Sequence, residues 1–199
     1  MGNNKFSAFG VAAVGVGFAA VLLLPGCSVN VKKEANGQDK QVDINTFAGG
    51  IHVSNDAEAS DTGLAVYPGA HLKAKDSSND NKSANVNISG FGYGVRVVAL
   101  EYESDDAPPR ILAFYKDQLK KYGNVLECHT SGLNLNMKMG SHGSRSDSND
   151  LTCEGDHGNN MELKVGKRDD QHIVAVKPEG KGSSFSLVYV RTHGKNADI

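Results

Sequence analysis

Seven histidines and three cysteines are the residues of this 199-residue chain that most readily act as bases, nucleophiles or metal ligands. The histidines form no His-Glu-x-x-His motif and no pair at helical spacing, and the spacing of Cys128 and Cys153 is neither Cys-x-x-Cys nor a zinc pattern. His129 follows Cys128, but adjacent strand residues point to opposite faces, which separates a thiol from its base. We therefore predict no catalytic residue, no metal site and no cofactor. A redox or metal site at the two cysteines is the alternative.

Glycines and acidic residues form further patterns with a chemical interpretation. Gly90-x-Gly92-x-Gly94 departs from the nucleotide fingerprint Gly-x-Gly-x-x-Gly and precedes a predicted strand, so we interpret it as a turn. This turn would expose Phe91 and Tyr93 as a candidate contact surface. Asp76-x-Ser78-x-Asp80 begins like a calcium loop but has Asn81 where the sharp turn needs glycine. A second acidic cluster, within 147–156, is typical of a solvated loop.

The third cysteine follows an apolar stretch near the N-terminus. Lys5 is the only side-chain charge in residues 1–7, residues 8–24 are apolar apart from glycines, and Leu22-Leu23-Leu24-Pro25-Gly26-Cys27 closes the stretch. This arrangement is similar to the signal peptide and lipobox of bacterial lipoproteins. The resemblance implies that the chain is cut before Cys27, and that acyl chains on this residue anchor the protein in a membrane.

The same resemblance implies a location for the protein. Ser28, rather than Asp, after the lipidated cysteine resembles the outer-membrane sorting pattern of enteric bacteria. We therefore expect the inner leaflet of the outer membrane, with the protein facing the periplasm. An uncleaved transmembrane helix over 6–24 is the alternative, because its length is close to the roughly 20 residues that a span needs. Glycines within the stretch and Pro25-Gly26 after it favour cleavage.

An oxidising compartment changes the interpretation of the other two cysteines. Thiols outside the cytoplasm are commonly oxidised, so we predict a disulfide between Cys128 and Cys153 that closes the polar loop over 131–149. In the chain-entropy model, a loop of this length stabilises the fold by about 3–4 kcal/mol. The net charge of −2, with lysines scattered among acidic residues, excludes the basic patch that nucleic acid requires.

Removal of a signal peptide over 1–26 leaves enough chain for one domain. Residues 29–41 are polar and lack periodicity, so we expect 27–41 to be the lipidated cysteine and a flexible tether. Residues 42–199 are then a single domain. Within it, Val42–Phe47 and Ile51–Val53 alternate as a hairpin does, and Val95–Glu103 alternates as a strand.

One helix and a series of strands are expected after residue 103. Ser104-Asp105-Asp106 supplies caps, Pro108-Pro109 fits a first helical turn, and Gly123 ends the helix. Further strands are predicted over 124–130, 150–155, 161–167, 172–178 and 185–192. This order predicts an α+β fold, an antiparallel sheet covered on one side by a single main helix.

A second resemblance covers Leu64 to Gly123. Tyr67-Pro68-Gly69-Ala70 before a strand, with the helical segment 105–119 after it, resembles uncharacterised bacterial envelope proteins. This resemblance supports the envelope location and brings no active site. Together the patterns predict a lipid-anchored envelope protein that acts as a non-catalytic binding or assembly module. Its partner would be an envelope protein, peptidoglycan or a small ligand. The alternative is an envelope hydrolase with a site near the 129–157 loop, using His129 or His157.

Overall fold

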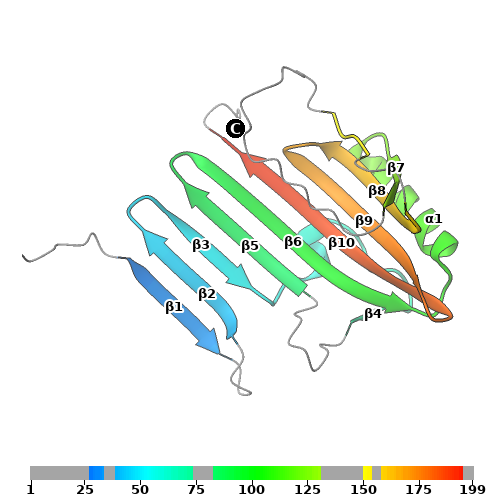
Figure 1. Ribbon diagram of the computed structural model, residues 1–199, viewed down its shortest axis with the longest axis horizontal. Coiled ribbons are helices and arrows are strands. Elements are labelled where there is room, and N and C mark those ends of the chain that lie inside the picture. The colour runs from blue at the N-terminus through cyan, green and yellow to red at the C-terminus, as the bar shows by residue number, and fades with distance from the viewer. Residues whose placement is uncertain (1–26, 34–38, 74–82, 131–149, 154–157, 195–199) are drawn as a thin grey trace, which may run out of the picture.

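One antiparallel sheet organises the chain (Figure 1). The computed structural model describes residues 27–33, 39–73, 83–130, 150–153 and 158–194. Within them, ten strands form a sheet in the order β1-β2-β3-β5-β6-β10-β9-β8-β7, and β4 pairs with β6 beyond the end of β5. The strands are β1 Ser28–Lys33, β2 Asp39–Thr46, β3 Gly49–Ser54, β4 His71–Leu72, β5 Ser83–Gly90, β6 Tyr93–Ser104, β7 Leu126–Thr130, β8 Asn160–Lys167, β9 Asp170–Glu179 and β10 Gly182–His193.

The predicted α+β fold class is wrong. Among the described residues the protein is largely an antiparallel sheet with one helical segment of 15 residues, α1 (Pro108–Leu119) continued by the 3-10 helix η2 (Lys120–Tyr122). Part of the segment 27–41, which was predicted to be a tether, belongs to the sheet, because β1 and the start of β2 lie in it and pair with each other. A helix this short covers only part of so wide a sheet.

The helix forms where the sequence predicts it, but its N-cap differs. Ala107 occupies the N-cap without a side-chain hydrogen bond, and Pro108 begins the first turn, where a missing N–H costs nothing. Asp106 instead accepts a hydrogen bond of 2.7 Å from the Tyr67 hydroxyl. Tyr115 on the buried face of α1 accepts a hydrogen bond from the Tyr67 backbone. The Tyr67-Pro68-Gly69-Ala70 turn is thereby fixed to the helix.

The hydrophobic core lies between α1 and one face of the C-terminal strands. Ile111, Tyr115 and Leu119 of the helix are fully buried, as the four-residue spacing on one helix face requires. They pack with side chains of β6, β8, β9 and β10 that alternate toward the helix: Val98, Leu100, Tyr102, Leu163, Val165, Val174, Val176, Phe185 and Leu187. The 3-10 helix η1 (Ala59–Thr62) lies on the same face and contacts β6 and β10.

The predicted disulfide is confirmed, although its setting differs from the prediction. Cys128 of β7 is bonded to Cys153. The bond closes the loop for which the sequence predicts stabilisation of the fold. Residues 150–153 form no strand, so the strand predicted over 150–155 is wrong there, and its last two residues lie outside the described part of the chain. The disulfide therefore joins the edge strand to an irregular segment.

The sheet divides into two parts with different surroundings. We call β6 to β10, with α1, η1 and β4, the closed half, because its side chains form the core. We call β1, β2, β3 and β5 the open half. Figure 1 shows no helix over these strands, which extend away from α1. Among the described residues, no helix combines the length and the apolar character that crossing a membrane requires.

Candidate functional site

The open half has an apolar face that no described element covers. In the strand register, residues directly opposite each other share a face. Two rows of apolar side chains result, Val29, Ile44, Ile51 and Ile88 in one, and Val31, Val42, Val53 and Val86 in the other, and Val95 and Val97 of the neighbouring β6 continue them. Between 39% and 62% of the surface of Val29, Val31, Ile51 and Ile88 is exposed. Adjacent exposed apolar residues of this kind mark an interaction surface, whereas isolated ones do not.

The other face of the same strands is polar. Asn30, Asp43, His52 and Asn87 form one row across β1, β2, β3 and β5, and Lys32, Gln41, Ser54 and Asn85 form the next. Asn87 of β5 is exposed, as is its neighbour Ile88, which points to the opposite face. The open half is therefore an amphipathic single layer. Its polar face can stay in water while its apolar face contacts another apolar surface.

An Asp–His pair lies on the polar face. His52 Nδ1 is 2.5 Å from Asp43 Oδ1, and Gln41 donates a hydrogen bond of 2.8 Å to Asp43 Oδ2. The hydrogen bond from His52 is the main reason that the pKa of Asp43 is lowered. Such a pair orients an imidazole for general base catalysis, but a hydrolase also needs a nucleophile within reach. Within the described residues, no hydrogen bond joins His52 to a serine, threonine or cysteine side chain.

This pair was not predicted from the sequence, although a signal for it exists. Asp43 and His52 each stand between two apolar residues of the predicted hairpin. The two-residue turn between the strands sets their register and places them opposite each other. A pairing prediction for the hairpin, rather than strand prediction alone, would have found the contact.

Of the two histidines proposed for a hydrolase, only His129 belongs to the described residues. His129 is an exposed residue of β7, and Cys128 beside it faces the other way and is bonded to Cys153, so these residues make no thiol–base pair. His157 lies outside the described residues, as do Asp76-x-Ser78-x-Asp80 and all of 131–149. Among the residues that the structure describes, no three His, Cys, Asp or Glu side chains converge as a metal site would need.

Exposed aromatic residues cluster at one end of the open half. Phe91 and Tyr93, predicted as a contact surface, are 75% and 63% exposed, and Phe47 of the β2–β3 turn is 82% exposed. The register aligns these turns, because Thr46 pairs with Gly49, Gly49 with Gly90, and Gly90 with Tyr93. The backbone N–H of Phe91 also donates to the Ala48 carbonyl at 3.2 Å. Phe47 was not predicted as a contact residue because the alternation over Val42–Phe47 assigns it to a strand, whereas β2 ends at Thr46 and Phe47 lies in the turn.

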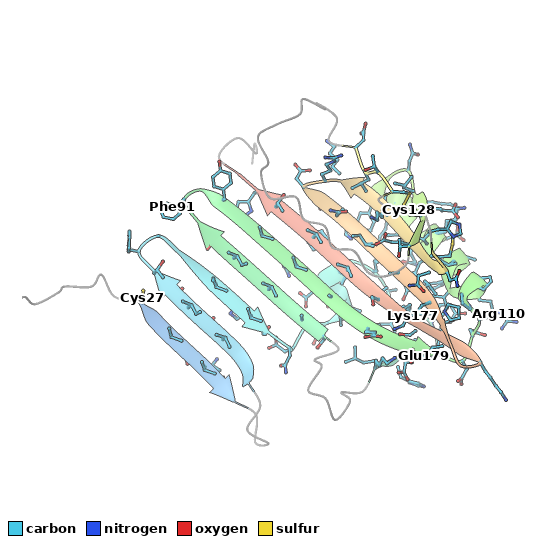
Figure 2. The ribbon with its side chains drawn as sticks, viewed as in Figure 1. Cys27, Phe91, Arg110, Cys128, Lys177 and Glu179 are labelled. Carbon is cyan, nitrogen blue, oxygen red and sulfur yellow. A yellow bond between two sulfur atoms is a disulfide. The ribbon has the colours of Figure 1, made fainter. Side chains whose placement is uncertain are left out.

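Cys27 belongs to the same end of the sheet. It is exposed, is the free cysteine of the described chain, and directly precedes Ser28, which pairs with Asn45 one residue before Thr46. Figure 2 shows Cys27 and Phe91 at the same end of the strands. We call the segments 45–50 and 89–94, together with Cys27, the turn end.

The opposite end of the sheet carries charges on the apolar side. Lys73, which is almost buried, contacts Glu179 at 2.7 Å, Glu103 at 3.2 Å and Glu101 at 3.6 Å. The hydrogen bond that Lys73 donates to Glu179 is the main reason that the pKa of Lys73 is raised, and the same contact lowers the pKa of Glu179. A shallow hollow of about 260 Å³ lies beside this cluster, lined by His71, Glu103, Asp105, Glu179 and Lys181 among others. Three carboxylates thus share Lys73, and Lys177 makes a further contact with Glu101 at 3.6 Å.

Comparisons with known proteins add no family to this description. No protein-family model, no curated protein and no solved structure matches the chain. The chemistry of the apolar face, the polar face and the turn end is therefore the basis for a functional interpretation.

Proposed function

We propose that the protein is a lipid-anchored, non-catalytic binding or assembly module of a bacterial envelope. The observation that carries the proposal is the apolar face of β1, β2, β3 and β5, which no described element covers, because adjacent exposed apolar side chains are stabilised by association. The partner that fits is a protein with an apolar surface of its own. A flat row of β-branched side chains offers neither the concave pocket that small ligands need nor the hydrogen-bond donors that sugars need.

The lipid anchor is part of the proposal. Support comes from the lipobox sequence Leu22-Leu23-Leu24-Pro25-Gly26-Cys27, and from the exposed position of Cys27 at the start of an edge strand. More than one acyl chain on this residue would hold the protein at a membrane surface, at about 0.8 kcal/mol for each buried methylene. The proposed location is the periplasmic side of the outer membrane. Concentration on a surface would help a weak apolar contact to form an assembly.

Two substitutions on neighbouring residues test the binding surface. Ile88→Asp places a carboxylate on the apolar face, and Asn87→Asp places the same carboxylate on the polar face of the same strand. We expect native electrophoresis of mild-detergent envelope extracts to show the parent protein and Asn87→Asp in a complex larger than the monomer. Ile88→Asp should migrate as the monomer, because a buried unpaired charge strongly opposes association.

Two controls separate the loss of a binding surface from misfolding and from the loss of lipidation. Equal thermal unfolding temperatures of the purified variants would exclude misfolding as the cause of a lost complex. A monomeric parent protein, or equal complexes for both variants, would contradict the binding role. Mass spectrometry of the N-terminal peptide tests the anchor separately, because an unmodified Cys27 would contradict lipidation.

A further inference from the structure

The turn end combines aromatic side chains with an absence of charge. Segments 45–50 and 89–94 contain no Asp, Glu, Lys or Arg, and each presents one exposed phenylalanine at the first position of a two-residue turn. Tyr93 adds a third ring, with a hydroxyl group that can remain in water. Amphipathic and apolar aromatic rings of this kind are characteristic of the membrane interface, where one part of a ring is buried and another is hydrated.

Phe91 is held there against its conformational preference. Its φ of 52° and the φ of 82° at Gly92 place both turn residues in the left-handed region, as a type I′ turn requires. Asn, Asp and Gly are the usual residues at the first of these positions, and a bulky aromatic side chain is unfavourable there. An exposed, conformationally strained aromatic residue contributes nothing to the core. Such outliers point to a function at the position.

Charges at the far end of the sheet, on the side of the apolar face, limit how the sheet can approach a bilayer. Along β6, the side chains Val95, Val97 and Ala99 share a face with Glu101 and Glu103, which contact Lys73. About 30 Å of strand separates Tyr93 from these carboxylates, at about 3.4 Å per residue. A sheet lying flat would press the ion cluster against the membrane, whereas a sheet standing on its turns would keep the cluster in water.

We infer that the turn end is a bilayer contact site, at which Phe47, Phe91 and Tyr93 enter the interfacial layer of the membrane and hold the strands upright. The inference rests on the proposed lipid anchor at Cys27, which lies at the same end of the sheet. A single anchor point leaves the domain free to rotate. The three rings provide further contacts, so the apolar face of the open half is presented sideways to partners above the membrane surface.

Single tryptophan substitutions test the inference, because the chain contains no tryptophan. The full chain, produced in a bacterium that processes lipoproteins, is reconstituted in phosphatidylethanolamine–phosphatidylglycerol vesicles that contain a brominated phosphatidylcholine as quencher. Phe47→Trp and Phe91→Trp report on the turn end. Leu72→Trp reports on the far end, and Val31→Trp reports on the apolar face; both replace exposed residues, as Phe47→Trp and Phe91→Trp do. Two reporters at the turn end keep the test valid if one variant fails to fold.

We expect blue-shifted emission and quenching by brominated lipid for tryptophan at positions 47 and 91. Tryptophan at position 72 should retain the emission of an exposed indole and escape quenching, and tryptophan at position 31 should be quenched less than at position 47. With Cys27 lipidated, absence of quenching at positions 47 and 91 would overturn the turn-end contact and leave the anchor intact. Equal quenching at positions 31 and 47 would show a sheet lying flat, or an apolar face bound to lipid, and would also overturn the inference. An unmodified Cys27 in the same samples would overturn the anchor and the contact together.

Discussion

The closed and open halves of the sheet use the same alternation of apolar and polar residues in different ways. In the closed half, Phe185 and Leu187 of β10 alternate toward α1 and are fully buried. In the open half, Ile51 and Ile88 alternate just as regularly, yet no described element covers them. Alternation therefore determines which side chains share a face. The two faces differ, because the register places Ile51 and Ile88 on the side of Val95 and Val97 of β6. This side is opposite to the face of β6 that α1 covers, so the apolar face of the open half does not continue the core under α1.

This contrast separates stability from recognition. Burial of side chains on both sides of a layer contributes most of the free energy of folding, so the closed half should contribute most of the stability. The open half gains its stability from strand pairing and adjacent side chains within one layer. It can consequently present a large apolar surface without being needed to hold the core together.

The strongest test of the contrast compares the same substitution in the two halves. Phe185→Ala should lower the free energy of unfolding by about 3–5 kcal/mol, because it removes a fully buried ring and leaves a cavity. Phe47→Ala should change it by less than about 0.5 kcal/mol, since the ring is exposed. Urea denaturation measures both values. Similar losses for the two variants would contradict the division into a stabilising and a presenting half.

The next effect concerns the disulfide at the edge of the closed half. Replacement of Cys128 and Cys153 by Ser should lower the free energy of unfolding by about 3 kcal/mol, because the unfolded chain regains the freedom of the closed loop. Differential scanning calorimetry under non-reducing conditions measures the loss. The proposed membrane attachment through Cys27 should remain unchanged, since the open half does not depend on this bond. An unaltered melting temperature would show that the cross-link contributes no stability.

A smaller effect, of the opposite sign, is expected in the open half. Phe91→Asn should raise the free energy of unfolding by about 1 kcal/mol, because Asn tolerates the left-handed conformation that Phe91 adopts. The same variant should bind membranes less firmly if the turn end contacts the bilayer. Thermal unfolding of the variant and the parent protein provides the measurement. A loss of stability would mean that Phe91 packs usefully within the fold, which would weaken the case for a presenting role.

The smallest expected effect is a pH dependence confined to the closed half. His172 is buried between Tyr122 and Tyr189, and its Nδ1 lies 2.9 Å from the Thr62 carbonyl oxygen. Burial is the main reason that its pKa is lowered. Because the unfolded state then binds the proton more readily, stability should fall as the pH decreases below the ordinary histidine pKa of about 6.5.

His172→Phe is the matched control for this dependence. It keeps a ring between the two tyrosines and removes the titrating group. We expect the melting temperature of the parent protein to decline between pH 7 and pH 5, and that of the variant to stay constant over this interval. Carboxylates with lowered pKa values, such as Asp43 and Asp106, lose their contribution only at lower pH. Parallel curves for the two proteins would show that His172 does not cause the decline.

The sequence predicts local structure better than it predicts the architecture. The stripe on α1 and the long strand β6 follow from periodicity, which is a local property, and the disulfide follows from the two cysteines that remain besides Cys27. The wide sheet does not, because β1 contains only Val29 and Val31 as apolar residues and gains its stability from pairing with β2. When a neighbouring strand supplies most of the contacts of a strand, the sequence of that strand predicts it only weakly.

For the same reason, only part of the candidate site could be predicted from the sequence. The glycine-rich turn indicated that Phe91 and Tyr93 are exposed, and they are. The apolar face and the pairing of Asp43 with His52 arise only when strands are placed side by side, so they depend on register. Residues 29–41 look like a tether in isolation, but within this range the described residues of β1 and the start of β2 become part of a sheet once their neighbours are known.

Position-specific photo-crosslinking tests the central claim most directly, the claim that the apolar face of the open half contacts a protein partner. A benzophenone amino acid is introduced at Ile88 or at Asn87, exposed residues that face opposite sides of β5, and the protein is irradiated in its native envelope. We predict one discrete protein adduct from position 88 and none from position 87. The absence of an adduct at position 88, or the same adducts from both positions, would contradict the account.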